Sequence, residues 1–244
     1  MIITLFDRYK ESDLINKMWV AARTCYSADN IRDLKIEAEN LTIEEKLDLI
    51  KKVFRSGHLS IAEHISFTFG ISGISRSCSH QLVRHRLCTF SQQSQRYTDL
   101  SKEKIDWIIP DSIQKDEYAL AYFQEALKAI EKAYCYSVEV GIKAEDARFI
   151  LPNACPTNIT VTTNLRNLMH IMGLRLCSRA QWEIRKVFQE MKAVTVARYA
   201  WLDDLLQPQC VHLGYCPEKF TCGKSITREQ ILKIVNLHKK SETL

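Results

Sequence analysis

The chain has 244 residues, of which 46% are hydrophobic and 26% charged, and its formal net charge is +5. This composition is that of a globular protein able to bury a substantial core, and no window reaches the ~18 uninterrupted apolar residues that a membrane span needs. The mild positive charge falls short of the strongly basic balance of a dedicated nucleic-acid-binding protein, and it suits a small anionic ligand at least as well.

The amino end and the cysteines indicate the compartment in which the protein is expected. Charge appears at Asp7 and Arg8, which is too early for the apolar core of a signal peptide. The nine cysteines are odd in number, and most of them are scattered, so reduced thiols are the better reading. The sequence therefore predicts a soluble, cytoplasmic protein.

The first third of the chain contains signals for two strands and two helices. Residues 1–5 read as a strand, and apolar residues at helical spacing over 14–22 predict a helix after it. Residues 42–45 have the form of a capping box, and Gly57 ends the helix that follows. The alternation of apolar with polar or small residues over 64–74 predicts a strand.

The rest of the chain mixes long helical patterns with one extended segment. Residues 116–140 predict a long helix, because an apolar stripe recurs with helical period at Ala119, Phe123, Ala126, Ile130, Ala133 and Val138. Residues 158–163 favour a strand. Residues 166–198 favour a long helix, in which Gly173 is a candidate point of interruption. The irregular order of these signals predicts an α+β fold, with a central mixed or antiparallel sheet and long helices in a single domain.

The carboxyl end differs in character from the rest. We expect a catalytic domain over 1–207 and a cysteine-containing tail over 208–244, with a short helix over 226–238. Three cysteines and a histidine stand in the tail, at Cys210, His212, Cys216 and Cys222, and such a set is able to bind zinc. The five-residue gaps between the cysteines are wider than those of a usual zinc knuckle, so we predict a reduced loop without metal.

The densest chemistry lies between residues 81 and 97. Positions 84–96 hold three arginines, one histidine and no carboxylate, and hydroxyl or carboxamide side chains fill 91–95. A guanidinium group is always charged and grips phosphate oxygens with two parallel hydrogen bonds. A phosphorylated ligand requires such a segment. A solvated basic surface, or helix-end arginines that pair with distant carboxylates, is an equally ordinary origin for a charge run.

The spacing within this segment is more specific than its charge. Arg84-His85-Arg86 is followed after seven residues by Ser94, and Arg96 comes two positions later. This pattern resembles the signature of the flavin-dependent thymidylate synthases. Segments at 57–64, 148–152 and 164–184 resemble further motifs of that family in the same order, so the likeness runs from about residue 20 to 200.

The resemblance implies the family's fold and its reaction. Its members methylate dUMP to dTMP, with FAD as cofactor, 5,10-methylenetetrahydrofolate as one-carbon donor and NADPH as reductant. They are homotetramers whose sites lie between subunits. Their substrates are small molecules, and no nucleic-acid or membrane partner is expected.

The resemblance also implies roles for individual residues. Cofactor contacts are expected at Ser60, Arg84, His85, Arg86, Gln92, Asn164, Arg166 and His170. Nucleotide contacts are expected at Gln81, Arg84, Gln92, Gln93, Ser94, Gln95, Arg96, Arg148 and Arg175. Arg175 and His58 are the candidate catalytic residues, and no metal ligand is implied. Many family members carry Asn-Glu where this chain has Ser91-Gln92. Gln92 lacks the charge of that acid but keeps its hydrogen-bonding capacity.

One geometric question concerns the helix expected after residue 165. Arg166 and His170 are four residues apart and share a helix face, whereas Arg175 is nine residues from Arg166 and falls on the opposite face. Either the helix breaks near Gly173, or its two faces serve different ligands.

Two other functions fit the same residues. One is a different FAD-dependent oxidoreductase that modifies nucleotides. The other is a single-stranded nucleic-acid-binding module in which Phe90 and Tyr97 stack on bases.

Overall fold

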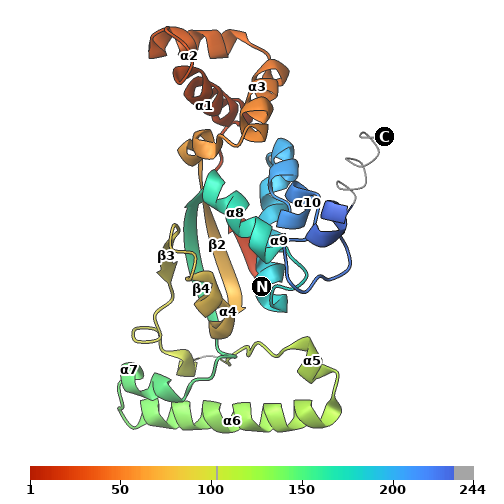
Figure 1. Cartoon of the computed structure of the whole chain (residues 1–244). Coiled ribbons are helices and arrows are strands. Elements are labelled where there is room, and N and C mark those ends of the chain that lie inside the picture. Colours follow the sequence, from red (N-terminus) through yellow and green to blue (C-terminus); the bar gives the residue numbers. More distant parts are fainter. Residues whose placement is uncertain (103, 234–244) are drawn as a thin grey trace. The chain divides into compact units, whose positions relative to one another are not determined.

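The structure, a computed structural model, describes residues 1–102 and 104–233. It has an α+β fold around a four-stranded antiparallel sheet, as the sequence predicts (Figure 1). The strands are β1 (Ile2–Leu5), β2 (Ser66–Ser75), β3 (Thr89–Gln92) and β4 (Pro156–Asn164), and their order in the sheet is β1-β2-β4-β3.

The two long strands pair in register and bury alternate side chains. The Leu165 amide donates to the Ile65 carbonyl at 2.7 Å, and the Arg76 amide donates to the Cys155 carbonyl at 3.0 Å, so the two ends of the β2–β4 pair are fixed. Alternate residues along β2 and β4 are buried, as period-two side-chain geometry requires, and they include Phe67, Phe69, Ile71, Ile159 and Val161. The observed strand β2 begins two residues later than the strand predicted over 64–74, because Leu59–His64 forms the 3-10 helix η1.

The chain divides into two compact units. One contains residues 1–4 and 69–161, and the other contains residues 5–68 and the described residues from 162 onward. The predicted division of the chain at residue 207 stays a prediction.

Three helices begin the second unit: α1 (Glu11–Thr24), α2 (Ile31–Asn40) and α3 (Ile43–Arg55). The buried Lys46 ammonium links them, since it donates to the Asn16 side-chain oxygen at 2.7 Å and to the Ala38 carbonyl at 2.8 Å. The predicted capping box is confirmed at the start of α3, and Gly57 follows the helix with φ of +80°.

The same unit continues with α8 (Leu165–Arg175), α9 (Trp182–Val196), η4 (Ala200–Leu205) and α10 (Gln209–Leu213). The helix-favouring stretch over 166–198 forms two helices, and the interruption follows Arg175 and does not fall at Gly173, since the chain leaves helix between Arg175 and Trp182. Gln181 starts α9 by accepting the amides of Glu183 and Ile184 at 3.0 Å. Gly173 lies inside α8 and packs close to Gln209 of α10.

The first unit contains α4 (Arg76–Leu82), α5 (Asp111–Gln114), α6 (Glu117–Glu139) and α7 (Ala144–Ala147), with short 3-10 turns at Leu100–Lys102 and Arg148–Ile150. The long helix predicted over 116–140 is confirmed as α6. The Asp116 side chain caps its start by accepting the Ala119 amide at 2.9 Å, and Gly141 follows its end with φ of +86°.

Most of the apolar surface of α6 is not buried by the residues that the structure describes. Leu127 and Tyr134 are its buried residues, whereas Tyr118 and Tyr122 are 79% and 74% exposed. The predicted stripe from Ala119 to Val138 is exposed or half-buried throughout. Helix α6 therefore presents apolar side chains at its surface, a feature typical of helices that contact another protein surface.

The carboxyl end is described only in part. Residues 228–233 are helical, and the remainder of the helix predicted over 226–238 lies outside the described residues. Within 1–102 and 104–233, no helix combines the length and hydropathy that crossing a bilayer requires.

Candidate functional site

The residues singled out from the sequence form two groups, one in each unit. The first unit holds Gln81, Arg84, His85, Arg86, Gln92, Gln93, Ser94, Gln95, Arg96 and Arg148. The second unit holds His58, Ser60, Asn164, Arg166, His170 and Arg175.

The arginine triplet lies in a tight turn between α4 and β3. The His85 amide donates to the Leu82 carbonyl at 3.2 Å, and the Cys88 amide donates to the His85 carbonyl at 3.0 Å. The turn exposes Arg84 and Arg86 and leaves His85 half-buried. Two guanidinium groups, two residues apart, therefore reach solvent from one short turn.

Gln92 ends β3 with its side chain turned into the protein. Its amide nitrogen donates to the Ser79 hydroxyl at 2.9 Å and to the Thr157 hydroxyl at 3.3 Å. Both hydroxyls are buried. Both amide hydrogens of Gln92 therefore have a structural use, which ties β3 to α4 and β4.

Two further glutamines hold the segment after β3 against β4. The Gln93 side-chain oxygen accepts the Asn158 amide at 3.2 Å, and the Gln95 amide donates to the Cys155 sulfur at 3.2 Å. Burial raises the pKa of the Cys155 thiol, so it is a neutral partner. These carboxamides, predicted from the sequence as nucleotide contacts, position the loop that carries Ser94 and Arg96.

An acidic side chain meets the arginine-rich segment. The Arg96 guanidinium pairs with the Glu145 carboxylate at 2.6 Å, and the Arg148 guanidinium donates to the Glu145 carbonyl at 3.1 Å. Arg96 also lies over the Tyr97 ring at 5.2 Å. Positions 84–96 contain no carboxylate in the sequence, but the surface that they form is not free of acids, because Glu145 pairs with Arg96. Sequence reasoning missed Glu145, because no local signal links it to a residue 49 positions earlier.

In the second unit, an ion pair joins two of the motif segments. Helix η1 packs against α8, and the Arg166 guanidinium pairs with the Glu63 carboxylate across this contact. Both side chains keep about half of their surface exposed, and Ser60 on η1 is exposed as well. The segments 57–64 and 164–184, distant in sequence, thus form one surface.

Helix α8 settles the question of its two faces. Asn164 caps it by accepting the Asn167 amide at 2.9 Å, and the helix runs unbroken through Gly173 to Arg175. Arg166 and His170 are exposed one turn apart, whereas Arg175 is half-buried in the last turn. The faces therefore differ, as they must if the helix serves two ligands.

His58 occupies a different setting from the other candidates. It is exposed just before η1, and it lines a cavity of about 300 Å³ that also receives Arg23 and Lys52. The neighbouring His64 is exposed on η1.

Comparison with known proteins identifies the family. The model of the thymidylate synthase complementing protein family matches residues 5–199. The chain belongs to this family. The match covers every candidate site residue from His58 to Arg175 and ends before the cysteine-containing tail.

The chain is similar in sequence to flavin-dependent thymidylate synthases from several organisms. The flavin-dependent thymidylate synthase of Geobacter sulfurreducens is 42% identical over 219 residues, which cover 89% of this chain and 93% of that protein. The enzyme of the same name from Pyrococcus abyssi is 45% identical, over 76% of this chain and 80% of that protein. The one from Thermococcus kodakarensis is 49% identical, over 69% and 71% respectively.

Proposed function

We propose that the chain is a flavin-dependent thymidylate synthase. The reaction methylates dUMP to dTMP, with 5,10-methylenetetrahydrofolate as one-carbon donor and NADPH as reductant. The observation that carries this proposal is the family match over residues 5–199, together with 42% identity to a protein of that name over 93% of its length. A biosynthetic enzyme for a nucleotide is expected in the cytoplasm.

The donor set of the chain fits FAD. A dinucleotide cofactor carries a diphosphate, and exposed guanidinium groups are its natural partners. Arg84 and Arg86 in the first unit and Arg166 in the second are exposed. The proposal makes Arg84, His85 and Arg86 the cofactor contacts of the first unit. Those of the second unit are Ser60, Asn164, Arg166 and His170. When bound, the flavin supplies the hydride, and the protein supplies binding and orientation.

The nucleotide phosphate requires donors that are able to leave their present partners. Arg96 is half-exposed in its pair with Glu145, and exposed ion pairs are worth little, so a phosphate can replace that carboxylate. The Ser94 hydroxyl accepts the Arg96 amide at 3.2 Å and still has its own hydrogen to donate. Arg148 and Gln81 complete the set, and the glutamines at 92, 93 and 95 hold the loop in place.

Arg175 is proposed as the catalytic residue for the pyrimidine ring. Methylation at C5 needs electron density on that carbon, and a fixed guanidinium near N3 and the adjacent carbonyl stabilises the negative charge that develops on the ring. Arg175 is half-buried, which strengthens its field relative to that of a solvated arginine. His58 is kept as a second catalytic candidate.

Helix α6 supports the proposal of a homotetramer. Its half-buried and exposed stripe follows steps of four and three residues through Ala119, Phe123, Ala126, Ile130 and Ala133, a spacing typical of helices that pack against a second helix. Exposed tyrosines beside the stripe add to the apolar surface. Light scattering of the purified protein should give the mass of four chains; the mass of one chain would remove this part of the proposal.

Two measurements test the activity. The purified protein should show a flavin absorption spectrum that bleaches when NADPH is added. It should also release tritium from C5-labelled dUMP in the presence of the folate donor. A flavin-loaded sample that bleaches but releases no tritium would refute thymidylate synthesis and leave a different flavin-dependent reaction. A sample that binds no flavin would refute both.

A further inference from the structure

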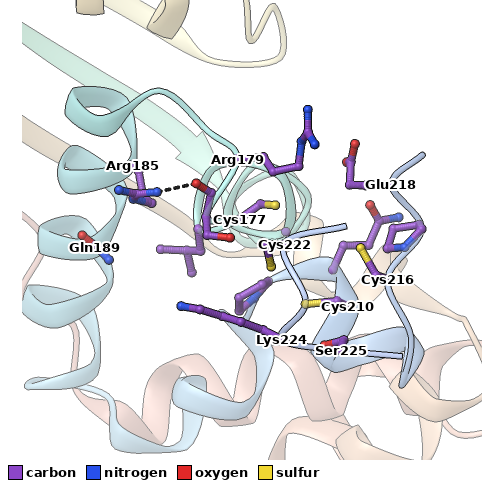
Figure 2. A pocket seen from close by; sticks show the side chains of 16 residues that line it. Cys177, Arg179, Arg185, Gln189, Cys210, Cys216, Glu218, Cys222, Lys224 and Ser225 are labelled. Atoms are coloured by element: carbon purple, nitrogen blue, oxygen red, sulfur yellow. Dashed lines mark hydrogen bonds between the residues drawn. The ribbon is translucent and has the colours of Figure 1, made fainter. Parts of the chain in front are cut away.

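A second cavity lies in the second unit, where the tail meets the end of α8 (Figure 2). Its volume is about 530 Å³, which is within the range of about 300–1,000 Å³ that small-molecule sites occupy. Four of the nine cysteines line it: Cys177, Cys210, Cys216 and Cys222. All four are free thiols. We call this space the thiol cavity.

The thiol cavity is also cationic. Arg179, Arg185 and Lys224 line it against the single carboxylate of Glu218, which leaves a formal surplus of two positive charges. Two of these cations are held in place by backbone carbonyls. The Arg185 guanidinium donates to the Ser178 carbonyl at 2.5 Å, and the Arg179 guanidinium donates to the Phe220 carbonyl at 2.6 Å. The cavity thus favours an anionic ligand.

The four thiols differ in access to solvent. Cys222 is exposed, Cys177 and Cys210 are half-buried, and Cys216 is buried. The pKa of the Cys222 thiol is lowered, because the Ser178 side chain and the Lys224 backbone stabilise the thiolate and the Lys224 charge adds to their effect. A thiolate is the nucleophilic form of cysteine. Cys222 is therefore accessible to solvent, lies near the positive charge of Lys224, and lines the same cavity as three other thiols.

The geometry favours sulfur chemistry over metal binding. His212, the imidazole of the zinc hypothesis, does not line the thiol cavity. Across residues 1–102 and 104–233, no three or more His, Cys, Asp or Glu side chains are grouped so as to hold a metal ion. The four thiols share a cationic cavity but are not grouped as metal ligands. This arrangement is suited to thiol–disulfide exchange with another sulfur compound.

We propose that the thiol cavity is a thiol–disulfide exchange site in which Cys222 reacts with a small anionic disulfide. The Cys222 thiolate attacks one sulfur of the disulfide and forms a mixed disulfide with it. The original sulfur–sulfur bond breaks, and its electron pair leaves on the departing thiolate, so no further oxidant is needed. The site goes beyond thymidylate synthesis and does not depend on it.

The test uses the reduced full-length chain and two disulfide reagents. Dithiobis(nitrobenzoate) carries two negative charges, and a dipyridyl disulfide is neutral at the same pH. The fastest phase of dithiobis(nitrobenzoate) reduction should disappear in Cys222→Ser. It should persist in Cys25→Ser, which removes an exposed cysteine that does not line the thiol cavity.

A charge variant separates attraction of the anion from simple exposure of the thiol. Lys224→Gln should slow the anionic reagent by about two- to fivefold relative to the neutral one, the range expected when one exposed cation is removed. Lys128→Gln makes the same charge change on α6, outside the thiol cavity, and should slow neither reagent. Equal slowing of both reagents by Lys224→Gln would overturn the proposal.

Peptide mass mapping of the unmutated protein keeps the test valid if Cys222→Ser fails to fold. A first adduct, or a first disulfide, that includes Cys222 supports the proposal. A first adduct on any other cysteine overturns it, and so does zinc that is released in stoichiometric amount when the thiols react.

Discussion

The two neighbouring glutamines at the end of β3 allow a matched test of what their side chains do. Gln92 donates to the hydroxyls of Ser79 and Thr157, which are 0% and 2% exposed, whereas the Gln93 side chain accepts one amide at an exposed position. Replacing Gln92 with Ala leaves two buried hydroxyls without this donor. Water cannot readily take its place, so the free energy of unfolding should fall by about 1–3 kcal/mol.

The same substitution at Gln93 provides the control. Water replaces the lost contact there, so Gln93→Ala should change stability by no more than about 0.5 kcal/mol. Thermal denaturation at one fixed protein concentration measures both, and for a chain of this size each kcal/mol lowers Tm by about 2–4 °C. Equal Tm values for the two variants would refute the reasoning. Loss of dUMP binding with an unchanged Tm in Gln92→Ala would show that this amide serves the ligand instead.

Three further predictions concern single side chains. Arg175→Ala should abolish tritium release while the protein keeps its flavin spectrum; loss of the flavin would mean that this arginine holds the cofactor. Glu145→Gln frees Arg96 from an exposed ion pair, so the KM for dUMP should fall by up to about fivefold in steady-state kinetics, and a raised KM would mean that Glu145 orients the arginine. The capping box lowers the pKa of Glu45, through hydrogen bonds from the Thr42 backbone and side chain. The carboxylate therefore stabilises the fold above its ordinary pKa, and this contribution is lost as pH falls through the lowered value. The Tm difference between wild type and Glu45→Gln should be present at neutral pH and vanish in acid, and a difference that grows in acid would contradict this sign.

Local signals predicted the elements that depend on neighbours in sequence. The capping box at Thr42, the stop at Gly57 and the long helix α6 each rest on residues within one or two turns. Of the two possibilities that the sequence leaves for Gly173, the break is wrong, because Gly173 is tolerated inside α8 and packs against Gln209, whereas Gln181 starts the next helix. An interior glycine is a weak signal next to a cap.

The sequence singled out the residues of the candidate site, whose roles stay predictions, but it did not predict the contacts that the structure gives them. Motif spacing singled out the arginine turn and the η1–α8 surface, yet three carboxamide side chains in the signature, at Gln92, Gln93 and Gln95, hold β3 and its loop against the protein. The Arg96–Glu145 pair joins residues 49 positions apart and the Arg166–Glu63 pair joins residues 103 positions apart. Such pairings follow from tertiary folding, which no local pattern encodes.

The unbroken helix α8 fixes the distance and the relative direction of the two arginines at its ends. Nine residues at 1.5 Å per residue separate Arg166 from Arg175 by about 13.5 Å along the helix axis and by half a rotation around it. If the first arginine holds the cofactor and the second the pyrimidine, their spacing and relative direction are set by a rigid rod and not by a flexible loop. An insertion between Arg166 and Arg175 would rotate one arginine relative to the other by about 100° for each added residue.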